Sequence, residues 1–222
     1  MLTRFLIGIV TITFSLAGLA AQVQDAFPDK INPKHNYVFY SHGFIVEGEN
    51  ATPVHPRWGK YDFPAVKNQL SDDGYQLIAY HRPKDTDPRE HAALLAKNVN
   101  QLIDAGVPPQ HIALVGFSRG GFITIVASNQ LKNSQVNFAI LAGCGDSIIN
   151  HPEFQFYGRI LSIYETSDQI GSCDAVNQRS NNATTYTELS ISTGKEHGAF
   201  YLPREEWLVP LKQWLKGAFN QH

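Results

Sequence analysis

The amino-acid sequence predicts an α/β protein with a mostly parallel sheet of about six strands and helices on both faces. Short apolar segments, typical of strands buried on both faces, alternate with segments whose apolar residues recur at helical spacing. The chain of 222 residues is 43% hydrophobic and 17% charged, which suits one packed core and excludes a disordered chain. We therefore expect a single domain over residues 22–222.

Residues 1–21 have the three-part layout of a secretory signal peptide. Arg4 lies at the start, residues 5–18 form an uncharged apolar run, and small residues follow around Ala20, where a signal peptidase would cut. The run is shorter than the roughly 20 apolar residues of a membrane-spanning helix, although a retained anchor is the alternative. We expect a secreted or periplasmic protein without membrane association after cleavage.

Composition narrows the classes of partner. The net charge is −2 and no basic block occurs, so nothing in the sequence favours a nucleic acid as partner. The nine histidines are scattered without metal-ligand spacing, and we expect neither a metal nor another cofactor. The chain has two cysteines, Cys144 and Cys173. An even number in an exported chain predicts a disulfide; the alternative is two free thiols in a reducing compartment.

The first half of the chain predicts two strands and two helices. Residues 36–41 form a short apolar strand that ends at a glycine turn. Residues 44–60, with two prolines and two glycines, are expected to be irregular. Helical spacing predicts a helix over 62–71, and residues 75–80 are typical of a buried strand. A second helix over 87–106 has an aspartate cap, a proline at its first position and a glycine past its end.

The second half continues the alternation. Residues 111–116 predict a strand and residues 120–132 a helix. Three further strands are expected over residues 136–143, 159–168 and 184–192. The final helix lies within residues 203–219, and Pro210 is expected to kink it or to delay its start. Its apolar stripe consists of Trp207, Leu208, Leu211, Trp214 and Leu215.

The segment Gly116–Gly120, "GFSRG", fits the pattern G-x-S-x-G. It follows an expected strand and opens an expected helix, which is the context the pattern requires. In such a turn the serine is held in a strained conformation with its hydroxyl clear of the sheet. Glycines two positions before and after prevent a collision between strand and helix. Ser118 is therefore the candidate nucleophile, which needs a histidine to accept its proton and a carboxylate to orient that histidine.

With this strand-to-helix turn around Ser118, called the elbow below, the chain resembles the α/β-hydrolase family. In that family the nucleophile, the acid and the histidine follow one another in this order along the chain. The resemblance implies Asp168, at the end of an expected strand, as the acid, and His197, past the last expected strand, as the base. His151 precedes Asp168 and breaks the order, and His222 is the last residue. Three other carboxylates are rivals to Asp168, namely Glu165, Asp146 and Asp174.

The resemblance also implies an oxyanion hole. "YSHGF" over residues 40–44 resembles the family's HG turn, so the backbone N–H groups of Phe44 and Arg119 are the expected donors. A simple glycine turn is the alternative. Candidate substrate contacts are His42, Arg82, Trp58 and Phe200. The Arg82 guanidinium could hold an acidic group, or it could be a surface group paired with Asp85 or Asp87.

Two departures from the family pattern shape the expected function. The family's first two strands have little room here, and the segment 144–158 is too short for an inserted lid. In the resembled fold the two cysteines follow neighbouring strands, so their bond would pin the loop that carries the acid. We expect an exported serine hydrolase with an open site for a small-molecule ester or acyl substrate. The alternatives are a peptidase or thioesterase with the same residues, or a non-catalytic binding protein.

Overall fold

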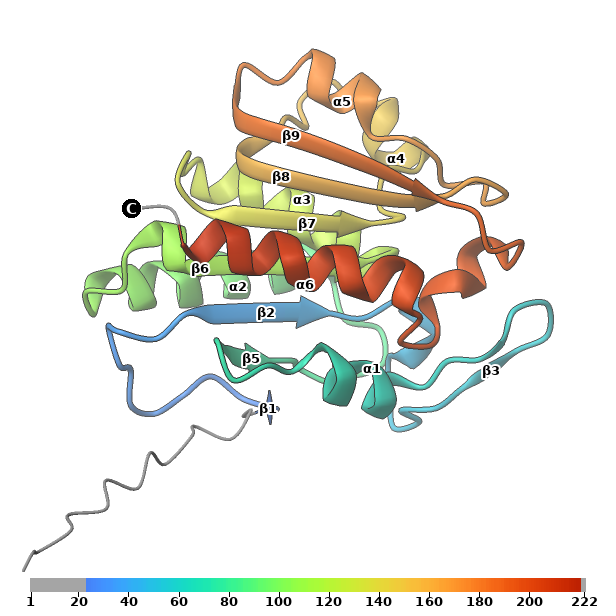
Figure 1. The fold of residues 1–222 in the computed structure, drawn as a ribbon, viewed down its shortest axis with the longest axis horizontal. Helices are drawn as coiled ribbons and strands as arrows, with labels where there is room; N and C mark the ends of the chain where they lie inside the picture. The colour runs from blue at the N-terminus through green and yellow to red at the C-terminus, as the bar shows by residue number, and fades with distance from the viewer. Residues whose placement is uncertain (1–22, 221–222) are drawn as a thin grey trace, which may run out of the picture.

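The computed structural model describes residues 23–220, which fold around a seven-stranded sheet (Figure 1). The strand order is β1-β5-β2-β6-β7-β8-β9, and every neighbouring pair is parallel. The α/β class with a mostly parallel sheet is therefore confirmed. The predicted signal peptide and His222 lie outside the described residues.

The strands fall where the apolar segments predicted them, with one addition. The sheet strands are β1 Val23–Gln24, β2 Tyr37–Ser41, β5 Gln76–Ile78, β6 Ile112–Phe117, β7 Asn137–Leu141, β8 Tyr157–Glu165 and β9 Asn182–Ile191. The added strand is β1, which has only two residues and pairs with β5 at the sheet edge. Val23 and Gln24 are too few to show a strand pattern, and a pairing of this length depends on backbone hydrogen bonds rather than on buried side chains.

The helices α1, α2, α3 and α6 match the periodic segments, whereas the short helices α4 and α5 were not predicted. The α-helices are α1 Phe63–Leu70, α2 Pro88–Asp104, α3 Arg119–Leu131, α4 Asp146–Ile149, α5 Asp174–Gln178 and α6 Glu205–Phe219, with 3-10 turns η1 Phe44–Val46, η2 Pro109–His111 and η3 Glu196–Phe200. Asp87 caps α2 by accepting hydrogen bonds from the N–H groups of Arg89 and Glu90. Pro210 lies inside α6 and does not delay its start. None of the helices described between residues 23 and 220 is long and apolar enough to cross a membrane.

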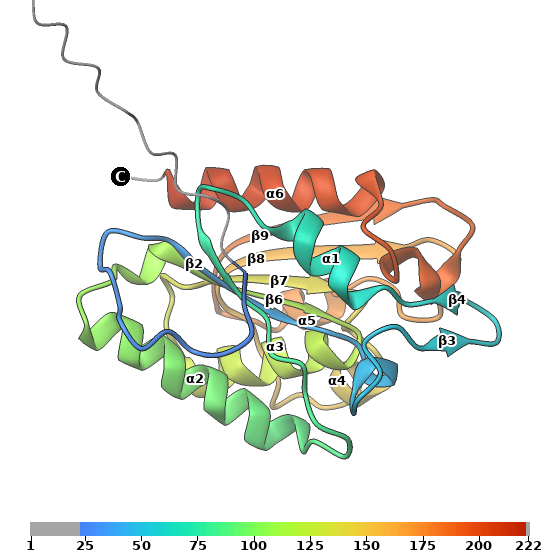
Figure 2. The same cartoon turned by 90° about the horizontal axis from the view of Figure 1, so that it is seen from below.

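Helices cover both faces of the sheet, as expected. Figure 2 shows α1 and α6 on one side and α2, α3 and α4 on the other. Successive residues of β2 illustrate the reason: Val38 and Tyr40 belong to one buried cluster, and Tyr37 and Phe39 belong to the other. Because side chains alternate between the faces of a strand, only a strand buried on both sides is apolar throughout.

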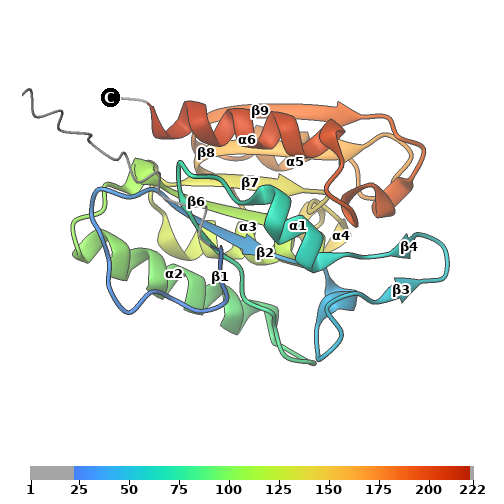
Figure 3. The same ribbon diagram turned by 60° about the horizontal axis from the view of Figure 1, so that its bottom comes forward.

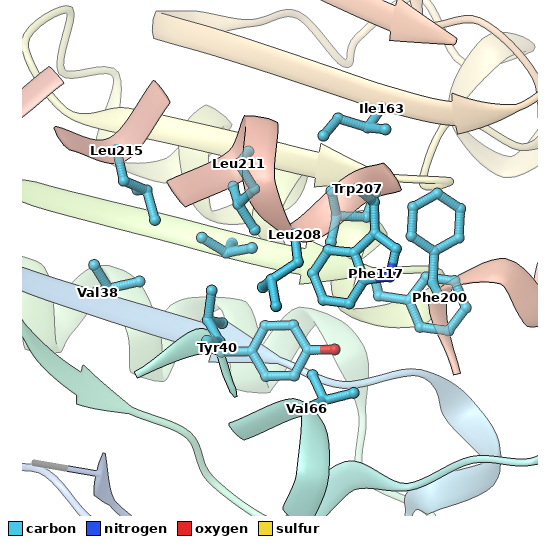
Figure 4. Close-up of a cluster of buried hydrophobic side chains, with 14 of the residues drawn as sticks. Val38, Tyr40, Val66, Phe117, Ile163, Phe200, Trp207, Leu208, Leu211 and Leu215 are labelled. Carbon is cyan, nitrogen blue, oxygen red and sulfur yellow. The ribbon is translucent and has the colours of Figure 1, made fainter. Parts of the chain in front are cut away.

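The apolar stripe of α6 packs onto the sheet through Trp207, Leu208, Leu211 and Leu215 (Figure 4). Each of these side chains is buried, and Trp214 packs against the same cluster while partly exposed. Figure 4 also shows Phe117, the last residue of β6, next to Trp207 and Phe200. The terminal helix therefore supports the strand end from which the candidate nucleophile projects.

A short hairpin, β3 Val54–His55 and β4 Gly59–Lys60, lies outside the main sheet. It belongs to the segment that was expected to be irregular. Figure 3 shows the hairpin projecting beyond the main sheet at the end toward which the arrows of β7 and β9 point. In α/β proteins, ligands bind at the carboxyl ends of the parallel strands, so the hairpin lies at the expected place for a site.

Cys144 and Cys173 form a disulfide with a Cα–Cα distance of 5.3 Å, which confirms the predicted bond. Both residues are buried. Cys144 follows β7, while Cys173 precedes α5 after the turn that leaves β8, and β7 and β8 are neighbours in the sheet. The disulfide joins the two connections that follow the carboxyl ends of the adjacent strands β7 and β8.

Two buried histidines make the fold sensitive to acid. His42 is fully buried and His91 is 9% exposed. Burial, with a further contribution from the positive charge of Arg82, lowers the pKa of His42 well below its usual value and that of His91 to about 4. In the unfolded chain each imidazole titrates near pH 6.5. The unfolded state therefore binds more protons than the folded state between those values, and stability decreases as the pH falls through this window.

Replacing both cysteines by alanine is expected to lower the free energy of unfolding by about 3–4 kcal/mol, because the unfolded chain regains the freedom that the cross-link removed. Urea denaturation of the double variant and the oxidised wild type would measure this. Reduced wild type is the control and should lose a similar amount. A loss below about 1 kcal/mol would contradict the stabilising role of the bond.

The variant His91→Gln is expected to weaken the acid sensitivity. Because the pKa of His91 is lowered to about 4, this residue accounts for about 2 kcal/mol of the stability that the wild type loses between pH 7 and pH 5. Urea titrations at both pH values should show a loss smaller by this amount in the variant. The matched control is His151→Gln, an exposed histidine, which should behave as the wild type. Equal losses in all three proteins would refute the assignment.

Candidate active site

Ser118 lies in a sharp turn between β6 and α3. Its φ of 56° and ψ of −116° place a residue with a side chain in a strained backbone conformation. The Ser118 N–H donates to the carbonyl oxygen of Leu141 at 2.9 Å, which joins the turn to the end of β7, and its carbonyl oxygen accepts from the N–H of Phe122 at 3.0 Å. These bonds hold the strained turn in place.

The glycines around Ser118 are required by close backbone contacts. A Cβ atom on Gly116 would lie 2.0 Å from the carbonyl oxygen of Gly120, the strand-to-helix collision expected from the motif. A Cβ atom on Gly120 would lie 1.9 Å from the carbonyl oxygen of Ser41 at the end of β2. Gly121, which the motif does not require, has a similar reason: its Cβ would lie 2.7 Å from Gly143. The elbow therefore packs directly against the neighbouring connections.

The structure brings Ser118, His197 and Asp168 into one chain of hydrogen bonds. His197 Nε2 lies 2.8 Å from Ser118 Oγ, and His197 Nδ1 lies 2.6 Å from Asp168 Oδ2. An ionised carboxylate only accepts hydrogen bonds, so the proton on the ring belongs to Nδ1. Nε2 is then free to accept the proton of the serine hydroxyl. The three residues come from connections that follow three different strands, β6, β8 and β9.

The imidazole of His197 is sheltered but reachable. His197 is 8% exposed, and the side chain of Asp168 is 4% exposed. Two aromatic rings pack near the imidazole, with centroid distances of 4.8 Å to Phe117 and 5.2 Å to Trp58. Water is thereby kept from most of the ring, which strengthens its hydrogen bonds. The arrangement can move a proton between a serine hydroxyl and an imidazole.

The rival carboxylates occupy other places. Asp146 and Asp174 lie in the first turns of α4 and α5 and are exposed. Glu165, the last residue of β8, is fully buried, and its carboxylate accepts hydrogen bonds from the N–H groups of Ser167, Thr193 and Gly194. Burial alone would raise the pKa of Glu165, but these hydrogen bonds outweigh it and lower the pKa. Glu165 therefore ties the turn that carries Asp168 to the connection that carries His197.

The hairpin braces the connection that carries His197. Glu196, with a left-handed φ of 51°, receives hydrogen bonds from Arg57 at 2.6 Å and from Trp58 Nε1 at 2.9 Å. The bond from Arg57 and the one from Trp58 lower the pKa of Glu196. Gly198 packs so closely on the hairpin that a Cβ atom there would lie 2.7 Å from the Cβ of Trp58. The strained residue before His197 is thus held by a segment that precedes it by more than a hundred positions.

Phe44 and Arg119, the expected oxyanion donors, both line the pocket beside Ser118. Arg119 is the first residue of α3, where backbone N–H groups have no partner within the helix. Phe44 is preceded by Gly43, whose N–H donates to the hydroxyl of Tyr61 at 3.4 Å. This bond orients the turn that leads to Phe44. The two N–H groups remain candidates for binding an oxyanion.

His42 and Arg82 do not line the pocket, and the expectation that they contact substrate is not supported. His42 is fully buried, and both ring nitrogens bind backbone, Nε2 accepting from the Arg82 N–H at 3.0 Å and Nδ1 donating to the Gly43 carbonyl at 2.8 Å. The surface alternative for Arg82 is wrong too. Its side chain is fully buried and pairs with Glu47 at 3.2 Å, not with Asp85 or Asp87. Burial lowers the pKa of Arg82, and the pairing with Glu47 opposes this.

The aromatic candidates divide between core and pocket. Trp58 lines the pocket, and so does Tyr201. Phe200 is fully buried and packs against Phe117, with a centroid distance of 5.3 Å, so it is a core residue and not a substrate contact. Phe200, the last residue of η3, and Tyr201 are adjacent in the chain, so local sequence spacing gave no signal for which of the two side chains lines the pocket.

The pocket at Ser118 has a volume of about 600 Å³, within the usual range for small-molecule sites. Its apolar lining comes mainly from Phe44, Ile45, Trp58, Phe122, Ile170 and Tyr201. The only helix in the segment between β7 and β8 is the short helix α4, so the segment holds no inserted lid, as its length led us to expect. Within residues 23–220, no group of three histidine, cysteine or carboxylate side chains is placed to hold a metal ion.

Sequence reasoning missed Glu47, Arg57 and Glu196. Each forms an ion pair with a residue distant in the chain, for which spacing offers no signal. The one available indication was the position of Glu196 directly before His197.

The sequence matches no family model and no curated protein. Solved structures share its fold. A variant of Arabidopsis thaliana SOBER1 has a TM-score of 0.54 and 15% identity over 83% of this chain and 100% of that one. An arylesterase has a TM-score of 0.58 and 12% identity over 87% and 79% of the two chains. Est1E from Butyrivibrio proteoclasticus, solved with ferulic acid, has a TM-score of 0.53 and 14% identity, over 86% of this chain and 91% of that one. The chain therefore has an α/β-hydrolase-like fold.

Proposed function

We propose that the protein is an exported serine hydrolase that cleaves a carboxylic ester of a small molecule through an acyl-enzyme. The observation that carries this proposal is the chain of hydrogen bonds from Asp168 through His197 to Ser118, at a strained turn that opens into a pocket. A binding protein has no use for a strained serine paired with an oriented imidazole, which argues against a non-catalytic role.

In the proposed mechanism, His197 Nε2 accepts the hydroxyl proton of Ser118 while the Ser118 Oγ attacks the carbonyl carbon. The negative charge that develops on the carbonyl oxygen is stabilised by the backbone N–H groups of Phe44 and Arg119. His197 then donates its proton to the leaving alcohol, and the acyl group stays on Ser118. A water molecule, activated by the same imidazole, releases the acid. Asp168 stabilises the imidazolium that forms in both halves.

Three structural neighbours support an ester as the substrate class. Solved structures with this fold include an arylesterase, a carbohydrate esterase from gut microbiota and a protein with bound ferulic acid. The same fold hosts other acyl transfers, so the bond must be tested directly. Rates on matched short esters, thioesters and peptide amides would separate an esterase from a thioesterase or a peptidase. A faster rate on the amide would overturn the ester assignment.

The buried disulfide supports export, because such bonds persist in oxidising compartments. We therefore propose secretion or delivery to a periplasm with removal of residues 1–21. Mass spectrometry of the N-terminus of the exported protein tests this directly.

Replacing Ser118 by alanine is expected to lower kcat on 4-nitrophenyl acetate by about 10⁴-fold or more, because the acyl-enzyme cannot form. A fluorophosphonate probe should label the wild type at Ser118 and leave the variant unlabelled. Far-UV circular dichroism serves as the control for folding. Retention of a tenth or more of the wild-type rate would refute the proposed nucleophile.

The variant Asp168→Asn is expected to lower kcat by about 10⁴-fold, because an amide in this position no longer holds the productive tautomer of the imidazole. Asp146→Asn is the matched control, since this carboxylate is exposed on α4 and does not contact His197. Initial rates at saturating ester compare the three proteins. Equal losses in both variants would mean that the reaction does not depend on Asp168 as proposed.

A further inference from the structure

The side chain of Arg119 has features of a binding group that the proposed mechanism does not use. The mechanism needs only its backbone N–H. The residue lines the pocket next to Ser118, together with Phe44, Pro88 and Phe122. Its side chain is 32% exposed, so the guanidinium can be reached by a ligand in the pocket.

The guanidinium is fixed in position by neighbours that leave one side of it free. Its carbon lies 4.2 Å from the ring centroid of Phe44, so the aromatic ring covers one face. One nitrogen, Nη1, donates to Glu47 at 3.3 Å and to the Thr86 carbonyl at 3.5 Å. In the part of the chain that the structure describes, Nε and Nη2 donate to no protein group, and neither is enclosed away from solvent.

The local charge favours an anion. Glu47 is shared between two guanidinium groups, those of Arg119 and the fully buried Arg82. One carboxylate therefore faces two positive charges in a region that excludes most water. Asp87 also faces Arg119, but it is exposed and its carboxylate caps α2. Charges in solvent are screened more strongly than buried ones, so the positive charge of Arg119 is not fully compensated on the pocket side.

We propose that the substrate of this site is an ester that carries a second, free carboxylate, and that Arg119 binds that carboxylate through Nε and Nη2. The guanidinium edge with these two donors matches a planar carboxylate in a bidentate arrangement. Because Ser118 and Arg119 line the same pocket, one small molecule can present its scissile carbonyl to Ser118 and its free carboxylate to Arg119. The inference rests on the proposed ester hydrolysis and specifies its substrate class.

The test compares two esters, 4-nitrophenyl hydrogen adipate and 4-nitrophenyl methyl adipate, in which the second carboxyl group is either free and charged or blocked as a neutral methyl ester. A second pair, 4-acetoxybenzoate and its methyl ester, places the carboxylate on the alcohol side. In at least one pair the wild type is expected to favour the anionic ester in kcat/KM by about tenfold, the usual strength of a charge-assisted bidentate bond. The preference should shrink as ionic strength rises.

Variants of Arg119 distinguish a side chain that binds the substrate carboxylate from one that only packs against Phe44. In Arg119→Gln the preference is expected to fall to near one, and in Arg119→Lys part of it should remain, because the charge persists without the planar fork. The matched control is Lys97→Gln on the exposed face of α2, which removes one positive charge away from the pocket and should keep the wild-type preference. Thermal unfolding of each variant verifies that it folds.

Two outcomes overturn the inference. In the first, the wild type hydrolyses both members of both pairs at equal kcat/KM. In the second, Arg119→Gln lowers the rates on anionic and neutral esters by the same factor, as expected of a residue that only braces Phe44. In both cases the proposed function stands, because neutral ester is still cleaved. If no ester is cleaved and the fluorophosphonate probe does not label Ser118, the proposed function fails and the inference fails with it.

Discussion

The close packing of the elbow on its neighbours is the constraint on which the rest of the site depends. Gly120 lies so near the Ser41 carbonyl that only a hydrogen fits between them, and the Ser118 N–H bonds to the Leu141 carbonyl. The first contact ties α3 to the end of β2, and the second ties the elbow to the end of β7. Helix, turn and two strand ends therefore form one rigid unit, in which the Ser118 hydroxyl has a defined direction.

His197 and Asp168 are held next to this unit by three separate sets of contacts, made by Glu165, the disulfide and the hairpin. Buried Glu165 joins the turn of Asp168 to the connection that leads to His197. The disulfide holds the same region from the side of β7, and the hairpin holds Glu196 from outside the sheet. Polar groups of this kind stabilise one arrangement over others because an unpaired buried carboxylate would cost several kcal/mol. The site is thus assembled by long-range contacts rather than by the local chain.

A second polar network lies behind the HG turn. His42 bonds to the backbone of Gly43 and Arg82, while Arg82 donates to the His42 carbonyl at 2.6 Å and pairs with Glu47. These groups are buried and serve the backbone, so their effect on a ligand is indirect. Through Glu47 the network reaches Arg119 at the pocket wall. Arg82 itself does not line the pocket, and its connection to the pocket wall is the carboxylate of Glu47 that it shares with Arg119.

The sequence by itself determined the class of fold and most of the elements through local periodicity, and it indicated Ser118 through the glycines around it. Asp168 and His197 were implied by the resemblance to the α/β-hydrolase family, whose site residues follow one another in this order along the chain. The tertiary structure decided how those residues meet, and that Phe200 and Arg82 point into the protein while Trp58 and Arg119 face the pocket. It also supplied the roles of Glu47, Arg57, Glu165 and Glu196. The physical reason is distance along the chain: a buried ion pair or a shared carboxylate joins residues that no local pattern relates, and its effect exists only once the strands are side by side.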